Sequence, residues 1–461
     1  MMSRLSGGVP LPETIRTLIL TASDVVWGPW TLALLLATGL FLTWRYRFVQ
    51  VVRFREALRT MIPPAAPGAS GALTPFQSFM TALGASIGTG NIAGVATAVV
   101  SGGPGAVFWI WVYGFLATTI KLTEAILGIR YRKTDGRGLS AGPMHYLSDG
   151  LGLRRLGWTY ALVAGIAALT TTPFTQPNSI AVVMESEFGI GPLLTGIVVA
   201  VLAWLVVIGG VTWIGRAAEA LAPLKIGLYL LGGLVVIVTH AAQLPSVLRL
   251  IVTEAFSPRA AAGSVAGIGI MVAMRYGLAR GIYANEAGYG TAAVVYGTAR
   301  SDRPVQQGLN AVMEVFVVSF LTSSISALTI LLTGAWRSGL TSTAAVARAF
   351  DSVLPTVGGA TVAFCVFLFG YTTLIGWAYY GEQFLEHVCG RWVVVPYRWV
   401  YCGLIVLGAI SKVDVVWAWG DLMNGLQIFP NLVGVLGLSG LVASMLTADA
   451  ARQRTTEDTK K

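Results

Sequence analysis

The stretch GASIGTGNIAGVATA, Gly84–Ala98, decides the fold. It lies in an apolar segment long enough to cross a membrane, yet four glycines stand in it beside Ser86, Thr89 and Asn91. A bilayer offers no hydrogen-bond partner to a free backbone N–H or C=O group, so a membrane helix is expected to be continuous. The glycines therefore predict a break in a membrane helix, with polar groups at the depth of that break.

The composition supports a membrane location. Of 461 residues, 55% are hydrophobic and 11% are charged, whereas soluble domains carry about 25% charged residues. The mean hydropathy is +0.71. In such a chain we assign the net charge of +10 to basic residues in the cytoplasmic loops of a membrane protein, rather than to nucleic-acid binding. We find no nucleophile–base pair, phosphate-binding loop or metal-ligand motif, so the sequence predicts neither an enzyme nor a bound cofactor.

The apolar segments and the basic residues between them predict how the chain crosses the bilayer. A membrane helix needs about 20 apolar residues. Arginines after the first and third apolar segments place the N-terminus outside and the C-terminus in the cytoplasm, in an inner or plasma membrane. Eleven predicted spans cover residues 25–46, 73–99, 105–130, 157–184, 192–211, 217–239, 263–284, 306–333, 357–386, 393–411 and 417–447.

The glycine pattern divides these spans into two halves. The seventh span begins AAGSVAGIGIMVA and contains Gly263, Gly267 and Gly269. With the first span set aside, the two glycine-broken helices head two sets of five spans, and an odd number of spans makes the sets inverted. Paired broken helices of this kind mark transporter binding sites; the alternative is that the glycines only allow close helix packing. The predicted parts are an N-terminal segment 1–72, a first repeat 73–239, a second repeat 240–447 and a polar tail 448–461.

Two further polar groups lie within predicted spans. Thr372 and Thr373 are adjacent, and Trp377 lies one turn beyond Thr373 on the same helical face. These residues predict a cation ligand beside a pocket wall, or else helix packing. Gln176 lies between Pro173 and Pro177. Prolines bend a helix and free backbone carbonyls, so Gln176 predicts a pocket residue, or else an interhelical hydrogen bond.

Charged residues near the spans favour one coupling ion. Lys121 and Glu124 are three residues apart and are expected to pair. Arg275 and Glu286 are expected to form inner-side gating or structural pairs, and the other charges, Lys225 among them, to lie toward span ends, away from the breaks. Proton-coupled carriers need a titratable relay in the membrane. Hydroxyls, amides and carbonyls at the predicted site therefore favour Na⁺, with a proton-coupled carrier of the same fold as the alternative.

At this point the sequence resembles the alanine/glycine:cation symporters, also called the sodium:alanine symporter family. The resemblance runs from about Thr74 to Leu446 through several motifs in the same order. The motifs are GTGNIAGVATA (Gly88–Ala98), GGPGAVFWIW (Gly102–Trp111), AGPMHYL (Ala141–Leu147), RYGLARGIYANEAGYGTA (Arg275–Ala292), PVQQGL (Pro304–Leu309), TTLIGWAYYGE (Thr372–Glu382) and IFPNLVGVLGLSG (Ile428–Gly440).

The resemblance implies an all-α fold of the LeuT type: an inverted five-plus-five repeat with one extra N-terminal helix. It also implies import of a small neutral amino acid, chiefly alanine or glycine, coupled to Na⁺ or H⁺. Carried onto this sequence, it implies Na⁺ ligands at Gly84, Ile87, Phe369, Thr372 and Thr373. The substrate-binding residues that we expect are Gly88, Thr89, Gly90, Asn91, Gln176, Gly267, Thr373 and Trp377.

Departures from the family pattern bear on the substrate. Pro173 and Pro177 replace a glycine-containing run before Gln176, Ala284 stands for a serine and His145 for a tyrosine. Serine or a D-amino acid is therefore an alternative substrate. A channel, a membrane receptor or an intramembrane enzyme is a rival reading, disfavoured by the paired breaks and by the lack of catalytic pairs. We expect a functional monomer whose partners are the amino acid, Na⁺ and lipid.

Overall fold

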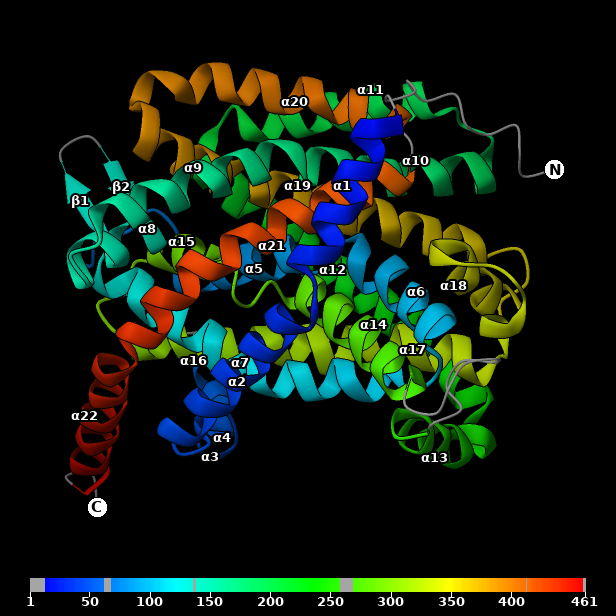
Figure 1. The fold of residues 1–461 in the computed structure, drawn as a ribbon, viewed down its shortest axis with the longest axis horizontal. Coiled ribbons are helices and arrows are strands. Elements are labelled where there is room, and N and C mark those ends of the chain that lie inside the picture. The colour runs from blue at the N-terminus through cyan, green and yellow to red at the C-terminus, as the bar shows by residue number, and fades with distance from the viewer. Residues whose placement is uncertain (1–12, 62–67, 136–137, 258–267, 412, 459–461) are drawn as a thin grey trace.

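The computed structural model describes residues 13–61, 68–135, 138–257, 268–411 and 413–458. Within these ranges the regular secondary structure is helical apart from one short hairpin and an isolated bridge between Leu73 and Ala299 (Figure 1). Six helices are long and apolar enough to cross a membrane, or up to eight spans exist if each of two bent helix pairs counts as one. The structure thus describes a polytopic all-helical protein, while the count of eleven spans and the inverted repeat stay predictions.

The helices and strands follow one another along the two halves of the chain. The first half contains α1 Glu13–Val26, α2 Pro29–Arg45, α3 Val49–Val52, α4 Phe54–Thr60, α5 Pro75–Ser86, η2 Thr89–Asn91, α6 Ala93–Gly102, α7 Ala106–Arg130, β1 Lys133–Asp135, β2 Gly138–Ser140, α8 Pro143–His145, η3 Tyr146–Gly150, α9 Arg154–Thr170, α10 Thr172–Phe188, α11 Pro192–Val207 and α12 Gly210–Thr239. The second contains η4 Ala241–Gln243, α13 Leu244–Ala255, α14 Ile268–Asn285, α15 Thr291–Gly297, α16 Pro304–Val315, η5 Phe316–Thr322, α17 Ser323–Leu332, η6 Ala335–Arg337, α18 Ser342–Asp351, α19 Gly358–Cys389, η7 Arg391–Val393, α20 Val394–Ile410, α21 Val413–Gly437 and α22 Ser439–Asp458.

Every predicted apolar segment overlaps at least one of these helices. The segment 157–184 differs from the prediction of one continuous span, because it forms two helices, α9 and α10, that meet at Thr171. Pro173 occupies the first turn of α10, where a missing backbone N–H costs nothing because that group has no intrahelical acceptor. The prolines noted in the sequence therefore include one that starts a new helix.

The first predicted break is present in the described structure. Thr74 and Gln77 form a capping box that starts α5, and α5 ends at Ser86. After η2 the chain continues as α6, and the axis turns by 60° between the two parts. The glycine-rich run thus interrupts the helix, as its weak helix propensity predicts.

The predicted second break, Gly263–Gly269, falls mostly outside the described residues, and the structure shows a further interruption after α14. Residues 263–267 are outside the described ranges, and Gly269 lies inside α14. The interruption falls between α14 and α15, where Glu286, Gly288 and Gly290 have φ angles of +58°, +98° and +84°. A left-handed backbone cannot continue a right-handed helix, so this turn ends α14 and α15 starts anew.

Close helix packing surrounds the breaks. Gly128 of α7 lies against α15, and a Cβ added to it would lie 2.3 Å from the Ala293 carbonyl oxygen.

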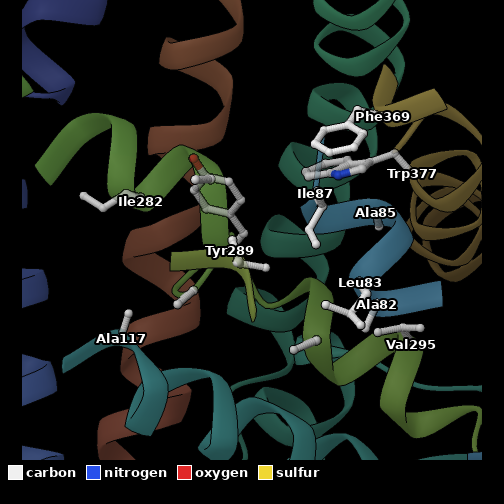
Figure 2. Close-up of a cluster of buried hydrophobic side chains, with 14 of the residues drawn as sticks. Ala82, Leu83, Ala85, Ile87, Ala117, Ile282, Tyr289, Val295, Phe369 and Trp377 are labelled. Carbon is white, nitrogen blue, oxygen red and sulfur yellow. The ribbon is translucent and has the colours of Figure 1, made fainter. Parts of the chain in front are cut away.

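In Figure 1 the β1–β2 hairpin and α22 lie at the left of the view, while α1 begins at the upper right. The buried apolar side chains include Ala85 and Ile87 from the first break, with Phe369 and Trp377 from α19 (Figure 2). The first break is therefore part of the core.

Candidate functional site

The break after α5 redirects backbone carbonyls toward other helices. In a continuous helix the Gly84 carbonyl would accept from the Gly88 N–H, but this N–H donates to the Ser86 carbonyl at 3.0 Å. The Thr373 hydroxyl of α19 lies 3.3 Å from the Gly84 carbonyl and 2.8 Å from the Ala85 carbonyl. The carboxyl end of α5 thus presents several acceptors in the protein interior, where each must find a donor or a cation.

Lys225 of α12 supplies such a donor. Its Nζ atom lies 3.0 Å from the Gly84 carbonyl, 2.6 Å from the Ile87 carbonyl and 2.5 Å from the Thr372 hydroxyl. It also lies 5.0 Å from the centre of the Phe369 ring. The side chain is fully buried. The Lys225 amine thus faces oxygens of three of the residues that the family resemblance assigns to Na⁺.

The expectation that Lys225 lies toward a span end, away from the breaks, is wrong. Helix α12 spans 30 residues from Gly210 to Thr239, so residue 225 stands at its middle. Ala218, Ala222, Lys225 and Tyr229 are all buried on this helix, and their spacing of three or four residues places them on one face. A lysine within an apolar stripe was the sequence signal for this position.

Gln176 of α10 meets the other side of the first break. Its Oε1 atom accepts from the Thr89 N–H and from the Thr89 hydroxyl, each at 3.0 Å. The Thr89 amide begins the short helix η2, where backbone N–H groups lack intrahelical acceptors. The first break thus has a lysine at its carbonyl end and an amide oxygen at its N–H end.

The second break is held in the same manner by two residues of α7. Lys121 Nζ lies 2.5 Å from the Asn285 carbonyl at the end of α14. Glu124 Oε1 accepts from the N–H groups of Gly288 and Gly290 at 3.0 and 3.2 Å, just before α15. Cations favour helix carboxyl ends and anions favour amino ends, so the α7 side chains match the polarity of the break.

The expected pair between Lys121 and Glu124 is therefore wrong. Lys121 instead forms an ion pair with Glu314 of α16 at 2.5 Å, and both side chains are buried. The Ser86 hydroxyl also lies 2.6 Å from Glu314 Oε1. This network joins the first break to the second, because Lys121 contacts both Ser86 and the end of α14.

A cavity lies between the two breaks. Its volume is about 20 Å³, which is room for about one water molecule, so the side chains of the lining lie close to one another. Three side-chain oxygens of its lining, Asn91 Oδ1, Thr171 Oγ1 and the Tyr289 hydroxyl, are buried without a hydrogen-bond partner in the described part of the chain. Because buried polar groups are normally paired, this lining suits a small polar ligand.

The structure brings most of the predicted substrate residues to this cavity. Thr89 is not part of the lining, but its hydroxyl donates to Gln176, which is. Gly267 lies outside the described residues. The predicted residues in the lining are Gly88, Gly90, Asn91, Gln176, Thr373 and Trp377. Their roles as ligands stay predictions. The added Cβ of an alanine at position 88 would lie 2.7 Å from Thr373 Oγ1, so the glycine lets the first break and α19 approach.

The sequence reasoning missed Glu286. The residue lines the cavity and is buried. Its two carboxylate oxygens accept from the Trp377 indole N–H at 2.6 Å and from the Thr291 hydroxyl at 3.0 Å. The expected inner-side pair with Arg275 is wrong, because Arg275 pairs with Asp24 at 2.6 Å. The sequence signal was the run NEAGYG, whose glycines predict a second break with an acid inside it.

Comparisons with known proteins agree with one another. The model of the family described as "Sodium:alanine symporter family" matches residues 12–461. The chain is 37% identical to the "Sodium/alanine symporter AgcS" of Methanococcus maripaludis, over 93% of this chain and 96% of that protein. It is 32% identical to the "Probable sodium/glutamine symporter GlnT" of Bacillus subtilis, over 96% of this chain and 92% of that one.

A solved structure shares the fold. The manganese transporter of Eremococcus coleocola has a TM-score of 0.55 with this chain, at 15% identity, over 84% of this chain and 89% of that one. At this identity the likeness concerns the fold alone.

Proposed function

Because the chain belongs to the sodium:alanine symporter family, we propose that it imports a small neutral amino acid together with a monovalent cation by alternating access. Alanine and glycine are the first candidates, and Na⁺ is the first candidate for the ion. The proposal includes the LeuT-type arrangement of an inverted five-plus-five repeat, preceded by one extra helix, in a monomer with the N-terminus outside and the C-terminus in the cytoplasm.

The observation that carries the proposal is the cavity between two broken helices. A zwitterionic amino acid needs an anion or carbonyls for its ammonium group and N–H donors for its carboxylate. Glu286 supplies a buried carboxylate on one side, and the side-chain amides of Asn91 and Gln176, which line the cavity, carry N–H donors on the other. Charge-assisted hydrogen bonds of this kind are the stronger ones.

The walls of the cavity support a small substrate, because the space between them is only about 20 Å³. Trp377 is fixed by its hydrogen bond to Glu286 and by contact with the Tyr289 ring, whose centre lies 6.4 Å away. A large ring held from two sides limits the space for the substrate side chain.

The cation site is proposed at the carbonyl end of α5. Its oxygens come from Gly84, Ile87 and Thr372, with Thr373 and Phe369 beside them. This site adjoins the cavity, because Thr373 lines the cavity and also donates to the α5 carbonyls. A cation there holds α5 against α19, so that binding of ion and substrate both favour one conformation.

Proton coupling is the second candidate, and a specific observation favours it. The sequence predicted a site without carboxylates, yet Glu286 lines the cavity and the Lys121–Glu314 pair lies next to Ser86. Buried ionisable groups within membrane proteins commonly belong to ion or proton paths.

The experiment has two steps. Purified protein is first screened for thermal stabilisation by each of the twenty amino acids, with and without Na⁺. Proteoliposomes are then tested for uptake of the stabilising amino acid with a Na⁺ gradient and no pH gradient. Accumulation supports Na⁺ coupling, and uptake with a proton gradient alone supports the second candidate. Conductance without saturable accumulation would show a channel instead.

A further inference from the structure

Lys225 occupies the proposed cation site. We infer that its ε-ammonium group is a tethered cation, a positive charge carried by the protein itself, which takes the place of a free Na⁺ among the oxygens of Gly84, Ile87 and Thr372. The amino acid then binds without Na⁺ at this position. The inference rests on the proposed function for amino-acid binding and for reading these oxygens as an ion site. It replaces Na⁺ at that site with the lysine, and so it favours proton coupling, the second candidate, over Na⁺ coupling.

The hydrogen bonds match a protonated amine. A lysine ammonium has three N–H donors and no acceptor, and Lys225 Nζ has three oxygen partners. The Thr372 hydroxyl donates its own hydrogen to the Leu368 carbonyl at 2.9 Å, so toward Lys225 it acts as an acceptor. Two carbonyls and one accepting hydroxyl therefore match the three donors of an ammonium group.

The geometry of the site suits one cation and excludes a second. Carbonyl oxygens that replace a hydration shell bind alkali cations, and in this protein the same oxygens already surround a positive nitrogen. A free Na⁺ within this set would lie next to the ammonium group, and two like charges in a water-poor interior repel strongly. The Phe369 ring closes another side of the site, with its centre 5.0 Å from Nζ.

Lys225 differs from the other buried lysine at a helix break. Lys121 has Glu314 as a counter-charge at 2.5 Å. Among the described residues, no carboxylate forms an ion pair with Lys225, and its hydrogen-bond partners are the three neutral oxygens. Two carbonyls, a hydroxyl and an aromatic ring thus surround Lys225, and neutral oxygens of this kind are the ligands that bind alkali cations.

Lys225 lies at the first break because it belongs to the buried face of α12. Position 225 lies on the buried face with Ala222 and Tyr229, and the chain separates Lys225 from Ile87 by 138 residues. The Gly84 backbone lies in ordinary contact with its neighbours, since an added Cβ would be 3.6 Å from Ala218 and 3.7 Å from Thr372. Helix α5 therefore packs on α12 and α19 at Gly84, next to the lysine.

The test measures the dependence of binding on Na⁺ in detergent-purified full-length protein. Unfolding temperatures are recorded against alanine or glycine in NaCl and in choline chloride of equal ionic strength. For the wild type we expect apparent affinities that agree within about twofold between the salts, because coupling between two ligands is typically about 5–150-fold when it exists. An affinity that is at least about fivefold tighter in NaCl overturns the inference.

Lys225→Ala provides the second arm. Its site keeps the oxygens and loses the tethered cation, so Na⁺ should now tighten amino-acid binding at least about fivefold, and Na⁺ alone should raise the unfolding temperature. Lys133→Ala removes a lysine whose side chain is 54% exposed and should behave like the wild type. A Na⁺ effect on the wild type as large as that on Lys225→Ala contradicts the inference.

The test decides the inference even if one of its measurements fails. If Lys225→Ala does not fold, the wild-type comparison of the two salts still decides. If no amino acid stabilises the wild type in either salt, the proposed function fails. The inference is then tested by the effect of Na⁺, without amino acid, on the unfolding temperature. A rise in Lys225→Ala that the wild type lacks supports the inference, and equal rises in the two proteins overturn it.

Discussion

At the residue scale, the contact between the first break and α19 depends on the absence of a side chain at Gly88. An added Cβ would lie 2.7 Å from Thr373 Oγ1 and 3.1 Å from Gln176 Oε1. Both oxygens take part in the hydrogen bonds of the first break. Gly88 therefore lets one turn of backbone meet two polar side chains at once.

Gly88→Ala should impair binding more than folding. The new methyl group displaces Thr373 and Gln176 and partly fills the cavity, and we expect at least about a tenfold loss of amino-acid affinity, or about 1.4 kcal/mol. The measurement is ligand-induced thermal stabilisation. Gly227→Ala is the control, because an added Cβ there meets no atom within 4 Å. Equal affinities in the two variants would contradict the assignment.

Glu286→Gln tests the carboxylate that lines the cavity. The replacement keeps the size of the side chain and an oxygen for the Trp377 indole N–H, but it removes the negative charge. Hydrogen bonds to charged groups contribute about 1.5–3 kcal/mol, so affinity should fall about 10- to 100-fold. Glu13→Gln, at a side chain that is 76% exposed, is the matched control. An unchanged affinity would remove Glu286 from the ammonium site.

At the element scale, each broken helix is held at both of its inner ends by side chains of other helices. Lys225 and Gln176 serve the first break, and Lys121 and Glu124 serve the second. Because backbone groups exposed by a break must be paired in a membrane protein, these side chains are what makes the breaks tolerable. A substitution of one of these side chains is therefore expected to destabilise the whole broken helix that it holds.

Glu314→Gln should destabilise the protein strongly. The change leaves the Lys121 ammonium buried without its counter-charge at 2.5 Å, and breaking a buried pair costs about 3–5 kcal/mol. The double variant Lys121→Met/Glu314→Gln removes both charges and should lose less than the sum of the two single changes. Unfolding in denaturant measures all four proteins. Strict additivity would show that the two residues do not interact.

The stability of the segment around α8 should depend on pH. Burial, and next the nearby His387, lower the pKa of His145 from 6.5 to about 4. The unfolded chain therefore binds more protons than the folded chain between these values, and stability falls as the pH drops through that window. Charging this histidine should cost about 3 kcal/mol between pH 7 and pH 4.

His145→Gln keeps a side-chain nitrogen for the Ser140 hydroxyl, which lies 2.8 Å from Nε2, and removes the titration. Unfolding temperature measured against pH should therefore fall less steeply in this variant than in the wild type. His240→Gln is the control and should keep the wild-type slope. Parallel curves for His145→Gln and the wild type would contradict the role of His145.

At the scale of the whole molecule, the two breaks are parts of one assembly. Lys121 contacts Ser86 of α5, the end of α14 and Glu314 of α16, and Asn431 of α21 donates to Glu124 at 2.7 Å. Helices far apart in the chain thus meet around the breaks. An alternating-access motion must move this group together or break these bonds.

The predicted orientation gives a test at the same scale. With the basic loops inside, a fluorescent protein fused after Lys461 should fold in the cytoplasm and fluoresce, and a periplasmic phosphatase fused at that site should be inactive. A phosphatase fused in the segment 334–341, between α17 and α18, should be active. The opposite pattern in both fusions would invert the topology.

The sequence by itself determined the features that depend on neighbours along the chain. Apolar segments predicted helices, and every predicted segment overlaps one. The glycines at 84–94 predicted the first break, because helix propensity acts on adjacent residues. The motifs also identified the family, which the comparison with the family model confirms. Six of the eight predicted substrate residues, all but Thr89 and Gly267, line one cavity, although their roles as ligands stay predictions.

Only the tertiary structure decided which charge meets which break. Sequence spacing suggested that Lys121 pairs with Glu124, but Lys121 finds Glu314, 193 residues away. Lys225 reaches the Gly84 carbonyl across 141 residues, and Glu286 faces the cavity because its backbone turns left-handed at φ +58°. The partners of a buried charge are set by packing between helices, because a buried charge needs polar partners wherever the fold places it, and no local pattern records that place.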